Sequence, residues 1–153
     1  MSGILIKLRK KKEIPQSILN KFRNKYQSIK DIEAKNGLNI NLSLAISLIE
    51  KLRHVIVHKG GKVSNKDNFI KLTLENCGLS NNGKNKQEHI DFINQYFGSG
   101  EYENLITLLE IRIREDLPIK IERDVLSILI GYLIGYAFLI IEMTYNQCRS
   151  ECT

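Results

Sequence analysis

The sequence has few cysteines and prolines, and it lacks the patterns that define metal ribbons and secreted scaffolds. Three cysteines occur, Cys77, Cys148 and Cys152, and no two of them form a CxxC pair. This usage excludes a disulfide scaffold and a thioredoxin-like redox motif, so we expect free thiols in a reducing compartment. Two prolines, no Gly/Ser-rich linker and no repeat of fixed period occur in the 153 residues. We therefore expect one globular domain over residues 1–153.

Lysine and arginine outnumber aspartate and glutamate, which gives the chain a net charge of +6. A basic surplus favours polyanionic partners, because phosphates release counterions when they meet cationic side chains. The first 13 residues form a basic segment in which a short apolar start precedes the run from Lys7 to Lys12. A secretory signal has the opposite order and a longer apolar core. We therefore expect a cytoplasmic protein, whose basic run is either a phosphate-contacting segment or a solvated tail.

Apolar residues recur every three or four positions over much of the chain, which predicts a mainly α-helical fold. Asparagine caps, Pro15 at a first turn and glycines at the ends mark the helix boundaries. The expected helices are residues 15–33 ended by Asn36-Gly37, a second helix from an Asn39 or Asn41 cap to Gly60-Gly61, residues 88–97, and residues 123–148.

Two regions between these helices alternate apolar and polar residues instead. Residues 69–74 read as a short strand, and residues 81–83 as a loop. Residues 110–115 and 119–122 alternate on either side of Asp116-Leu-Pro118. These two runs predict a short β-hairpin insertion, or a helix end followed by a strand.

The last expected helix contains the most apolar stretch of the chain, since residues 125–141 carry no charge. Such a length lies at the lower limit for a membrane span, but two tyrosines and a serine interrupt it. A helix that is apolar on all sides is also typical of the centre of a bundle or a dimer. Gly131 and Gly135 lie on one face and permit close approach of another helix. We favour the soluble interpretation.

The second expected helix carries an arginine in an unusual position. On a helical wheel Arg53 falls among the aliphatic residues Ile46, Ile49 and Val57. Burying a guanidinium is costly unless an anion or an acceptor meets it. We therefore expect one of three environments for the Arg53 side chain. It pairs with an internal acid, it extends to the rim of the core, or it faces a phosphate in a partly apolar groove. The polar residues form a continuous stripe of Ser43, Ser47, Glu50, Lys51, His54 and His58.

Two histidines lie in this stripe, four residues apart. His58 precedes the glycines that end the helix, where the helix C-terminus favours the protonated imidazole and a nearby Arg53 opposes it. His58 can thus serve as a general acid or base, or cap the last carbonyls. His54, His58 and Glu50 share a face as metal ligands would, but the zincin pattern has a glutamate where Val55 stands. We expect no metal and no cofactor.

The stretch Arg53-His54-Val-Ile-Val-His58 is an Arg-x4-His motif with a polar residue directly after the arginine. It resembles the active-site motif of HEPN-domain ribonucleases. The following Lys59-Gly60-Gly61-Lys62-Val63 resembles the glycine-containing continuation of many prokaryotic members. The motif region covers residues 48–63. Elsewhere the likeness is architectural, with a long helix before the motif helix and a long apolar helix at the end.

The resemblance implies a HEPN-like helical bundle that dimerises so that two motifs face one shared cleft. Members typically cleave RNA without a metal ion, because the ribose 2′-hydroxyl attacks the adjacent phosphate and leaves a 2′,3′-cyclic phosphate. Carried over to this chain, His58 handles the proton transfer, Arg53 stabilises the charge on the phosphorus oxygens, and His54 assists or orients. The candidates for nucleic-acid contacts are Lys51, Lys59 and Lys62, with the run from Lys7 to Lys12.

The resemblance also has limits within the family. One subgroup pairs with a nucleotidyltransferase and has a tyrosine two positions after the histidine, where this chain has Gly60. That antitoxin-coupled subtype is therefore not expected, while a toxin-like or defensive role in a prokaryote is. Many HEPN domains are binding or assembly modules. The alternative function is thus a non-catalytic helical module that binds RNA, a nucleotide or a partner protein through the same groove.

Overall fold

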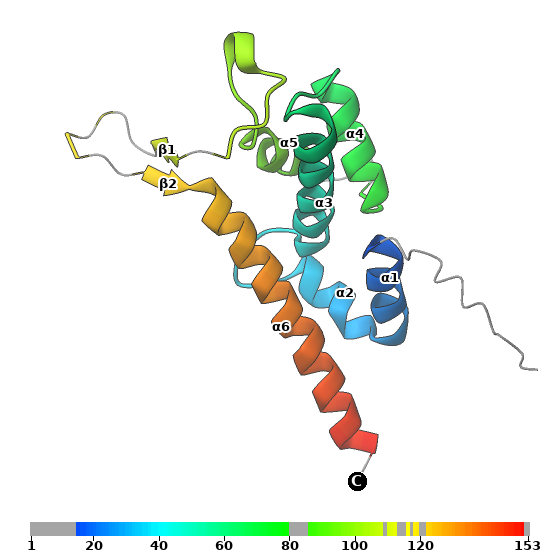
Figure 1. Cartoon of the computed structure of the whole chain (residues 1–153). Helices are drawn as coiled ribbons and strands as arrows, with labels where there is room; N and C mark the ends of the chain where they lie inside the picture. Colours follow the sequence, from blue (N-terminus) through cyan, green and yellow to red (C-terminus); the bar gives the residue numbers. More distant parts are fainter. Residues whose placement is uncertain are drawn as a thin grey trace, which may run out of the picture.

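The computed structural model describes residues 15–79, 86–108, 110–112, 116, 118–119 and 122–151. The predicted basic segment 1–13, with its run from Lys7 to Lys12, lies outside these residues, as do Cys152 and the loop 81–83. The described part is mainly α-helical, as predicted (Figure 1). Its elements are α1 (Pro15–Lys25), α2 (Gln27–Ala34), α3 (Leu42–Lys59), α4 (Lys66–Asn76), α5 (Lys86–Asn94), the 3-10 turn η1 (Gly100–Tyr102), β1 (Glu110–Arg112), β2 (Glu122–Asp124) and α6 (Val125–Glu151).

Helix α3 is the centre of the bundle and packs against α2, α4 and α6. Its buried side chains Leu44, Leu48, Leu52 and Val55 form the spine of the main core. Side chains from α4, α5 and the start of α6 complete that core, which buries Leu74, Ile93, Tyr96, Val125 and Leu129. A smaller cluster of Leu42, Tyr136 and Leu139 joins α3 to the middle of α6.

The predicted boundaries of α3 are confirmed. The side chain of Asn41, one of the two candidate caps, accepts a hydrogen bond from the Leu44 N–H at 2.9 Å. Gly60 ends the helix in the left-handed conformation, at φ 59°, which glycine adopts without the penalty of a Cβ. The Gly61 N–H then bonds back to the Val55 carbonyl at 3.2 Å. The helix therefore ends directly after His58 and Lys59.

The predicted single helix over residues 15–33 is wrong, because the chain breaks at Tyr26 into α1 and α2. Tyr26 is buried and extended, with φ −123° and ψ 94°. In one continuous helix Arg23 and Glu33 would lie about 15 Å apart. The break lets them meet, with Arg23 Nε 2.8 Å from Glu33 Oε1. A long-range ion pair thus overrides the local helical pattern.

The predicted strand over residues 69–74 is also wrong, since these residues lie in α4. Asn65 caps this helix by accepting a hydrogen bond from the Asn68 N–H at 2.7 Å. The buried residues Ile70, Thr73 and Leu74 follow helical spacing, and the Thr73 hydroxyl donates to the Phe69 carbonyl at 2.7 Å. The sequence alternates here by chance, because the polar Thr73 occupies a buried position of the helix where an apolar residue is usual.

The predicted β-hairpin is confirmed as an antiparallel pair of β1 and β2, in which Ile111 pairs with Arg123, but its second strand is Glu122–Asp124 instead of residues 119–122. Residues 113–115 and 120–121 of the two predicted runs lie outside the described part of the chain. The helix expected over residues 88–97 is confirmed as α5, which ends earlier, at Asn94. The hairpin leads directly into α6. There the Asp124 carboxylate accepts hydrogen bonds from the Ser127 N–H at 2.9 Å and the Ser127 hydroxyl at 2.6 Å, which lower the pKa of Asp124. The hairpin and α6 are therefore joined without a flexible connection.

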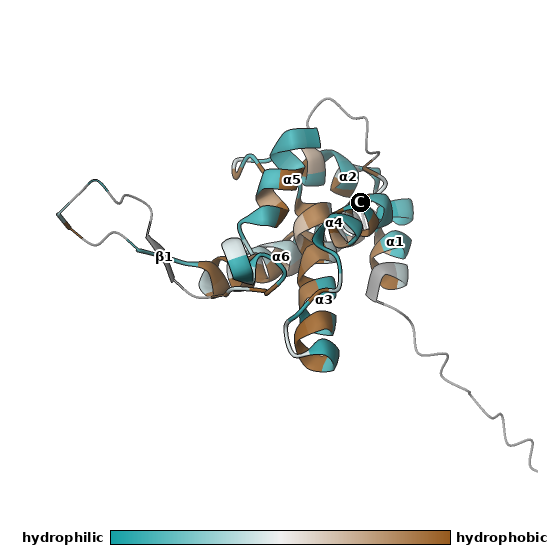
Figure 2. Cartoon of the chain, turned by 90° about the horizontal axis from the view of Figure 1, so that it is seen from above, coloured by the Kyte–Doolittle hydropathy of each residue, from teal (hydrophilic) through white to brown (hydrophobic). Residues whose placement is uncertain are grey.

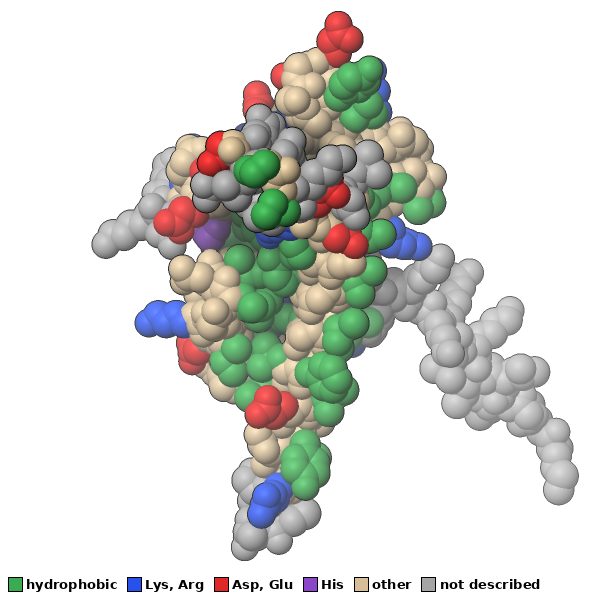
Figure 3. All heavy atoms as spheres, turned by 90° about the vertical axis from the view of Figure 1, so that its left-hand side faces the viewer, with side chains coloured by type: hydrophobic (Ala, Val, Ile, Leu, Met, Phe, Trp, Pro, Cys, Tyr) green, Lys and Arg blue, Asp and Glu red, His purple; other side chains and the backbone are tan. Residues whose placement is uncertain are grey.

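Helix α6 is the predicted long apolar helix, and only one of its sides is buried. Over Val125–Asn146 it is long and apolar enough to cross a membrane. The rest of the molecule buries 22% of this apolar stretch. Its other side is exposed, and Figure 3 shows hydrophobic side chains following α6 away from the hairpin. We call this exposed surface the open face of α6, consisting of Leu126, Ile130, Leu133, Ile134, Phe138, Ile141 and Tyr145.

Candidate functional site

The Arg-x4-His motif lies on the last turns of α3, which extend past the neighbouring helices (Figure 2). Val55 is buried there, whereas Ile56 and Val57 are 39% and 59% exposed. Arg53, His54 and His58 themselves, together with Lys59, are exposed as well. The motif residues are therefore presented on the surface by a helix whose other face anchors the core.

Arg53 borders an apolar groove of about 220 Å³ between α3 and α6. Every other lining side chain of this groove is aliphatic. We call it the aliphatic groove, lined by Ile49, Leu52, Arg53, Ile56, Val57, Leu108, Leu126, Leu129, Ile130 and Leu133. Its α6 wall belongs in part to the open face, so the two apolar surfaces are continuous and Arg53 lies at their edge.

Arg53 also borders a second groove, of about 380 Å³, between α3 and α4. Cations predominate among its charged groups. We call it the basic groove, lined by Ser47, Glu50, Lys51, Arg53, His54, Val55, Lys59, Phe69, Leu72 and Asn76. The structure thus brings four predicted site residues together, since Arg53, His54, Lys51 and Lys59 share one groove.

Arg53 has the aliphatic neighbours Ile49 and Val57 that the helical wheel predicts, and its side chain is exposed at the edge of the aliphatic groove. Leu126 and Ile130 of α6 line the same groove without covering this side chain. Within the described ranges, no carboxylate forms an ion pair with Arg53, and no acceptor takes a hydrogen bond from it. Its guanidinium is therefore available to an external anion at the junction of the two grooves.

The two histidines of the motif contact each other on the surface. The ring centroids of His54 and His58 are 4.7 Å apart, with 51° between the ring planes. Lys62 follows the helix end, where its backbone bridges to Leu105. The Ile106 N–H donates to the Gly61 carbonyl at 2.9 Å, which fixes the turn. Lys62 is exposed and lines neither groove, so it stands apart from the other cations.

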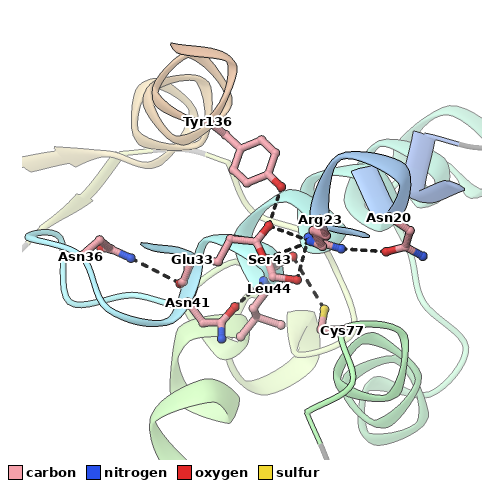
Figure 4. A network of polar contacts seen from close by, with 9 residues as sticks. All are labelled: Asn20, Arg23, Glu33, Asn36, Asn41, Ser43, Leu44, Cys77 and Tyr136. Carbon is pink, nitrogen blue, oxygen red and sulfur yellow. Dashed lines mark hydrogen bonds and ion pairs between the residues drawn. The ribbon is translucent and has the colours of Figure 1, made fainter. Parts of the chain in front are cut away.

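A second arginine, which the sequence interpretation missed, has the internal partner that Arg53 lacks (Figure 4). Arg23 Nε donates to both Glu33 oxygens, at 2.8 and 3.0 Å, and its other nitrogens donate to Asn20 and Ser43. The Tyr136 hydroxyl donates to Glu33 from α6, and burial together with this bond raises the pKa of Tyr136. The sequence signal for this pair is that Glu33 follows the apolar Ile29 by four residues, which places an acid on the apolar face of a helix.

Metal-ligating residues do not gather near the motif. Across the described part of the chain, no three side chains of histidine, cysteine, aspartate or glutamate are grouped as a metal site requires. Glu50 lines the basic groove together with His54. Cys77 lies half-buried just after α4, and burial raises the pKa of its thiol.

The comparisons with known proteins add no relative to this description. No family model matches the chain, and neither a curated protein nor a solved structure matches it.

Proposed function

We propose that the chain is a metal-independent endoribonuclease whose paired catalytic groups are Arg53 and His58. The observation that carries the proposal is the exposed, unpaired guanidinium of Arg53 between an aliphatic and a basic groove. Arg23 is held by Glu33, so the fold does satisfy arginines that serve as structural groups. The surplus of cations beside Arg53 favours a polyanion, and the Arg-x4-His resemblance makes RNA the expected one.

The chemistry needs only the ribose and these side chains. His58 removes the proton from the 2′-hydroxyl, O2′ bonds to the adjacent phosphorus, and the bond from phosphorus to O5′ breaks. His54, whose ring centroid is 4.7 Å from that of His58, donates a proton to the departing O5′. Arg53 stabilises the negative charge that accumulates on the phosphorus oxygens. Lys51 and Lys59 hold the flanking backbone of the RNA.

A second copy of the chain is the occupant that we propose for the open face of α6. Exposed apolar surface of this extent marks an interaction site. The open face is continuous with the aliphatic groove at Leu126, Ile130 and Leu133, so a copy packed there also reaches the edge at Arg53. Gly131 and Gly135 leave open space for a close approach. A two-fold axis at this face brings two motifs toward one cleft.

A lipid bilayer is the competing occupant, and the packing of α6 favours the second copy. Tyr136, near the middle of the apolar stretch, is buried against the Arg23–Glu33 pair. Placing α6 across a membrane would carry this ion pair, and the charged surfaces of α2 and α3, into hydrocarbon at high cost. We therefore propose a cytoplasmic homodimer.

Cleavage of RNA by the purified chain tests the proposed function directly. We expect a mixed RNA pool to be cut equally well with and without EDTA, because no step uses a metal ion. The new ends should carry a 2′,3′-cyclic phosphate, detected by mass spectrometry of the fragments. RNA with a 2′-O-methyl group at the cleaved position should resist. Cleavage that EDTA abolishes, or that persists on the 2′-O-methyl substrate, contradicts the mechanism, and salt-sensitive binding without cleavage supports the non-catalytic module.

Charges placed on the open face should separate the dimer. We expect the double variant Ile134→Asp/Phe138→Asp to be monomeric in light scattering without detergent and to lose cleavage, because each replaced side chain is more than half exposed and stabilises only the interface. The control Leu38→Asp/Tyr102→Asp introduces the same two charges at positions that are 61% and 63% exposed and lie outside α6, and it should remain dimeric. A wild-type monomer that cleaves at full rate would contradict this arrangement.

A further inference from the structure

A separate pocket of about 610 Å³ lies between α5, the start of α6 and the segment that precedes α3. Its size is within the range of small-molecule sites. It shares no lining residue with the aliphatic or the basic groove. Leu44 in its wall and Arg53 are nine residues apart on α3, which corresponds to about 13 Å. We call it the amide pocket, after Asn39, Asn41 and Gln95 in its wall.

Aromatic rings form one wall of the amide pocket. Phe92 of α5 and Tyr132 of α6 both line it, with ring centroids 6.1 Å apart and 49° between the planes. Phe92 is held from behind by Tyr96, whose ring meets it edge to face at 5.6 Å. Aromatic side chains fixed in this way are the platforms on which unstacked nucleobases lie.

The polar groups of the amide pocket include both carboxylates and hydrogen-bond donors. Glu88 and Asp91 line the pocket from α5 with exposed side chains, and Asp91 also accepts a hydrogen bond from Gln87 Nε2 at 2.8 Å. Gln95, in the turn after α5, and Arg123 of β2 supply donors. His89 is next to Glu88, and burial lowers the pKa of its imidazole, which disfavours a positive charge there.

A buried tyrosine supports the aromatic wall. Tyr96 is 1% exposed and does not itself line the amide pocket, and its ring meets that of Phe92 edge to face. Burial raises the pKa of Tyr96, so its hydroxyl keeps its proton. The ring of Phe92 is therefore held in place from the core.

We propose that the amide pocket binds a single unstacked nucleobase and that guanine is the base it prefers. Guanine presents N–H donors on its Watson–Crick edge, which suit the carboxylates of Glu88 and Asp91. It presents O6 and N7 as acceptors on its other edge, which suit the donors of Arg123 and Gln95. Adenine, cytosine and uracil lack this separation of two donors from two acceptors. Net charge in the pocket does not favour a phosphate, so the base itself carries the recognition.

Binding of free nucleosides to the full chain tests the proposal without any cleavage. In calorimetric titrations we expect guanosine to bind at least tenfold more tightly than adenosine, cytidine or uridine. L-Tryptophan provides an aromatic ring without guanine's edges and should not compete. Equal binding of all four nucleosides, displacement by tryptophan, or no nucleoside binding overturns the proposal. Arg53→Ala should bind guanosine as the wild type does, so failure of the nuclease proposal leaves this result intact.

Two sets of variants place the base in the amide pocket. Arg123→Gln removes the cation proposed to bind O6 and N7, so guanosine affinity should fall several-fold, whereas Lys71→Gln makes the same change of charge on α4 and should have no effect. Glu88→Gln/Asp91→Asn removes the carboxylates, and the preference for guanosine should fall about tenfold. Glu101→Gln/Glu103→Gln makes the same change of net charge at exposed positions as the control. Unchanged guanosine binding in both pocket variants places the base elsewhere and overturns the assignment.

Discussion

Replacing either Arg53 or His58 with alanine should reduce RNA cleavage at least a hundredfold while the protein stays folded. Loss of a positioned donor to a developing oxyanion typically costs a factor of about 10² to 10³. Loss of a general base costs a factor of about 10² to 10⁴. Both side chains are exposed, and neither has an ion pair in the described part of the chain. The free energy of unfolding should therefore change by less than about 0.5 kcal/mol.

Two further variants distinguish catalysis from simple attraction of RNA. Arg53→Lys keeps the charge but loses the planar fork, so RNA binding should persist while cleavage stays low. Lys62→Ala removes a cation that lines neither groove, so it should weaken binding slightly and leave the maximal rate unchanged. Single-turnover cleavage and filter binding, measured at matched salt, separate the two effects. Full cleavage by His58→Ala would contradict the proposed mechanism.

Removing the charge of Glu33 should destabilise the protein more than any surface change. Arg23 and Glu33 have side chains that are 8% and 6% exposed. Breaking a buried pair leaves one charge uncompensated, which costs about 3–5 kcal/mol. For a chain of this length, Glu33→Gln should lower the midpoint of thermal unfolding by about 6–20 °C. Differential scanning calorimetry and urea unfolding measure this change.

The chain contains its own control for this experiment. Lys71 and Glu75 form an ion pair on α4 at 4.0 Å, with side chains more than half exposed. Glu75→Gln should cost about 0.5 kcal/mol or less, because water screens such a pair. Arg23→Met/Glu33→Leu removes both buried charges and should recover much of the loss. A loss from Glu33→Gln no larger than that from Glu75→Gln would mean that the buried pair contributes little.

The sequence predicted those elements whose boundaries are determined by residues close to them in the chain. Asn41 and Gly60 define α3 because a side-chain cap and a left-handed residue act within one helical turn. The apolar run of α6 and the hairpin before it were predicted for the same reason. Helical geometry placed Lys51 and His54 on one polar stripe of α3, and both line the basic groove.

Long-range contacts determine the features that the sequence did not predict. The break at Tyr26 follows from the meeting of Arg23 with Glu33, and no local pattern encodes that distance. A helical wheel places Arg53 on an apolar flank of α3. A wheel carries no information on where the neighbouring helices end along the axis of α3. The amide pocket was missed because its walls come from segments that are distant in the sequence.

The hydrogen bond between Glu33 and Tyr136 has a consequence for the order of events during synthesis. The two residues are 103 positions apart. At ribosomal speeds of about 5–20 residues per second, the tyrosine is made about 5–20 seconds after the carboxylate. Through that interval Glu33 lacks the Tyr136 hydroxyl that donates to it, and the side of α3 that packs against α6 is uncovered. We therefore expect nascent chains that end before α6 to engage chaperones and to be cut readily by proteases.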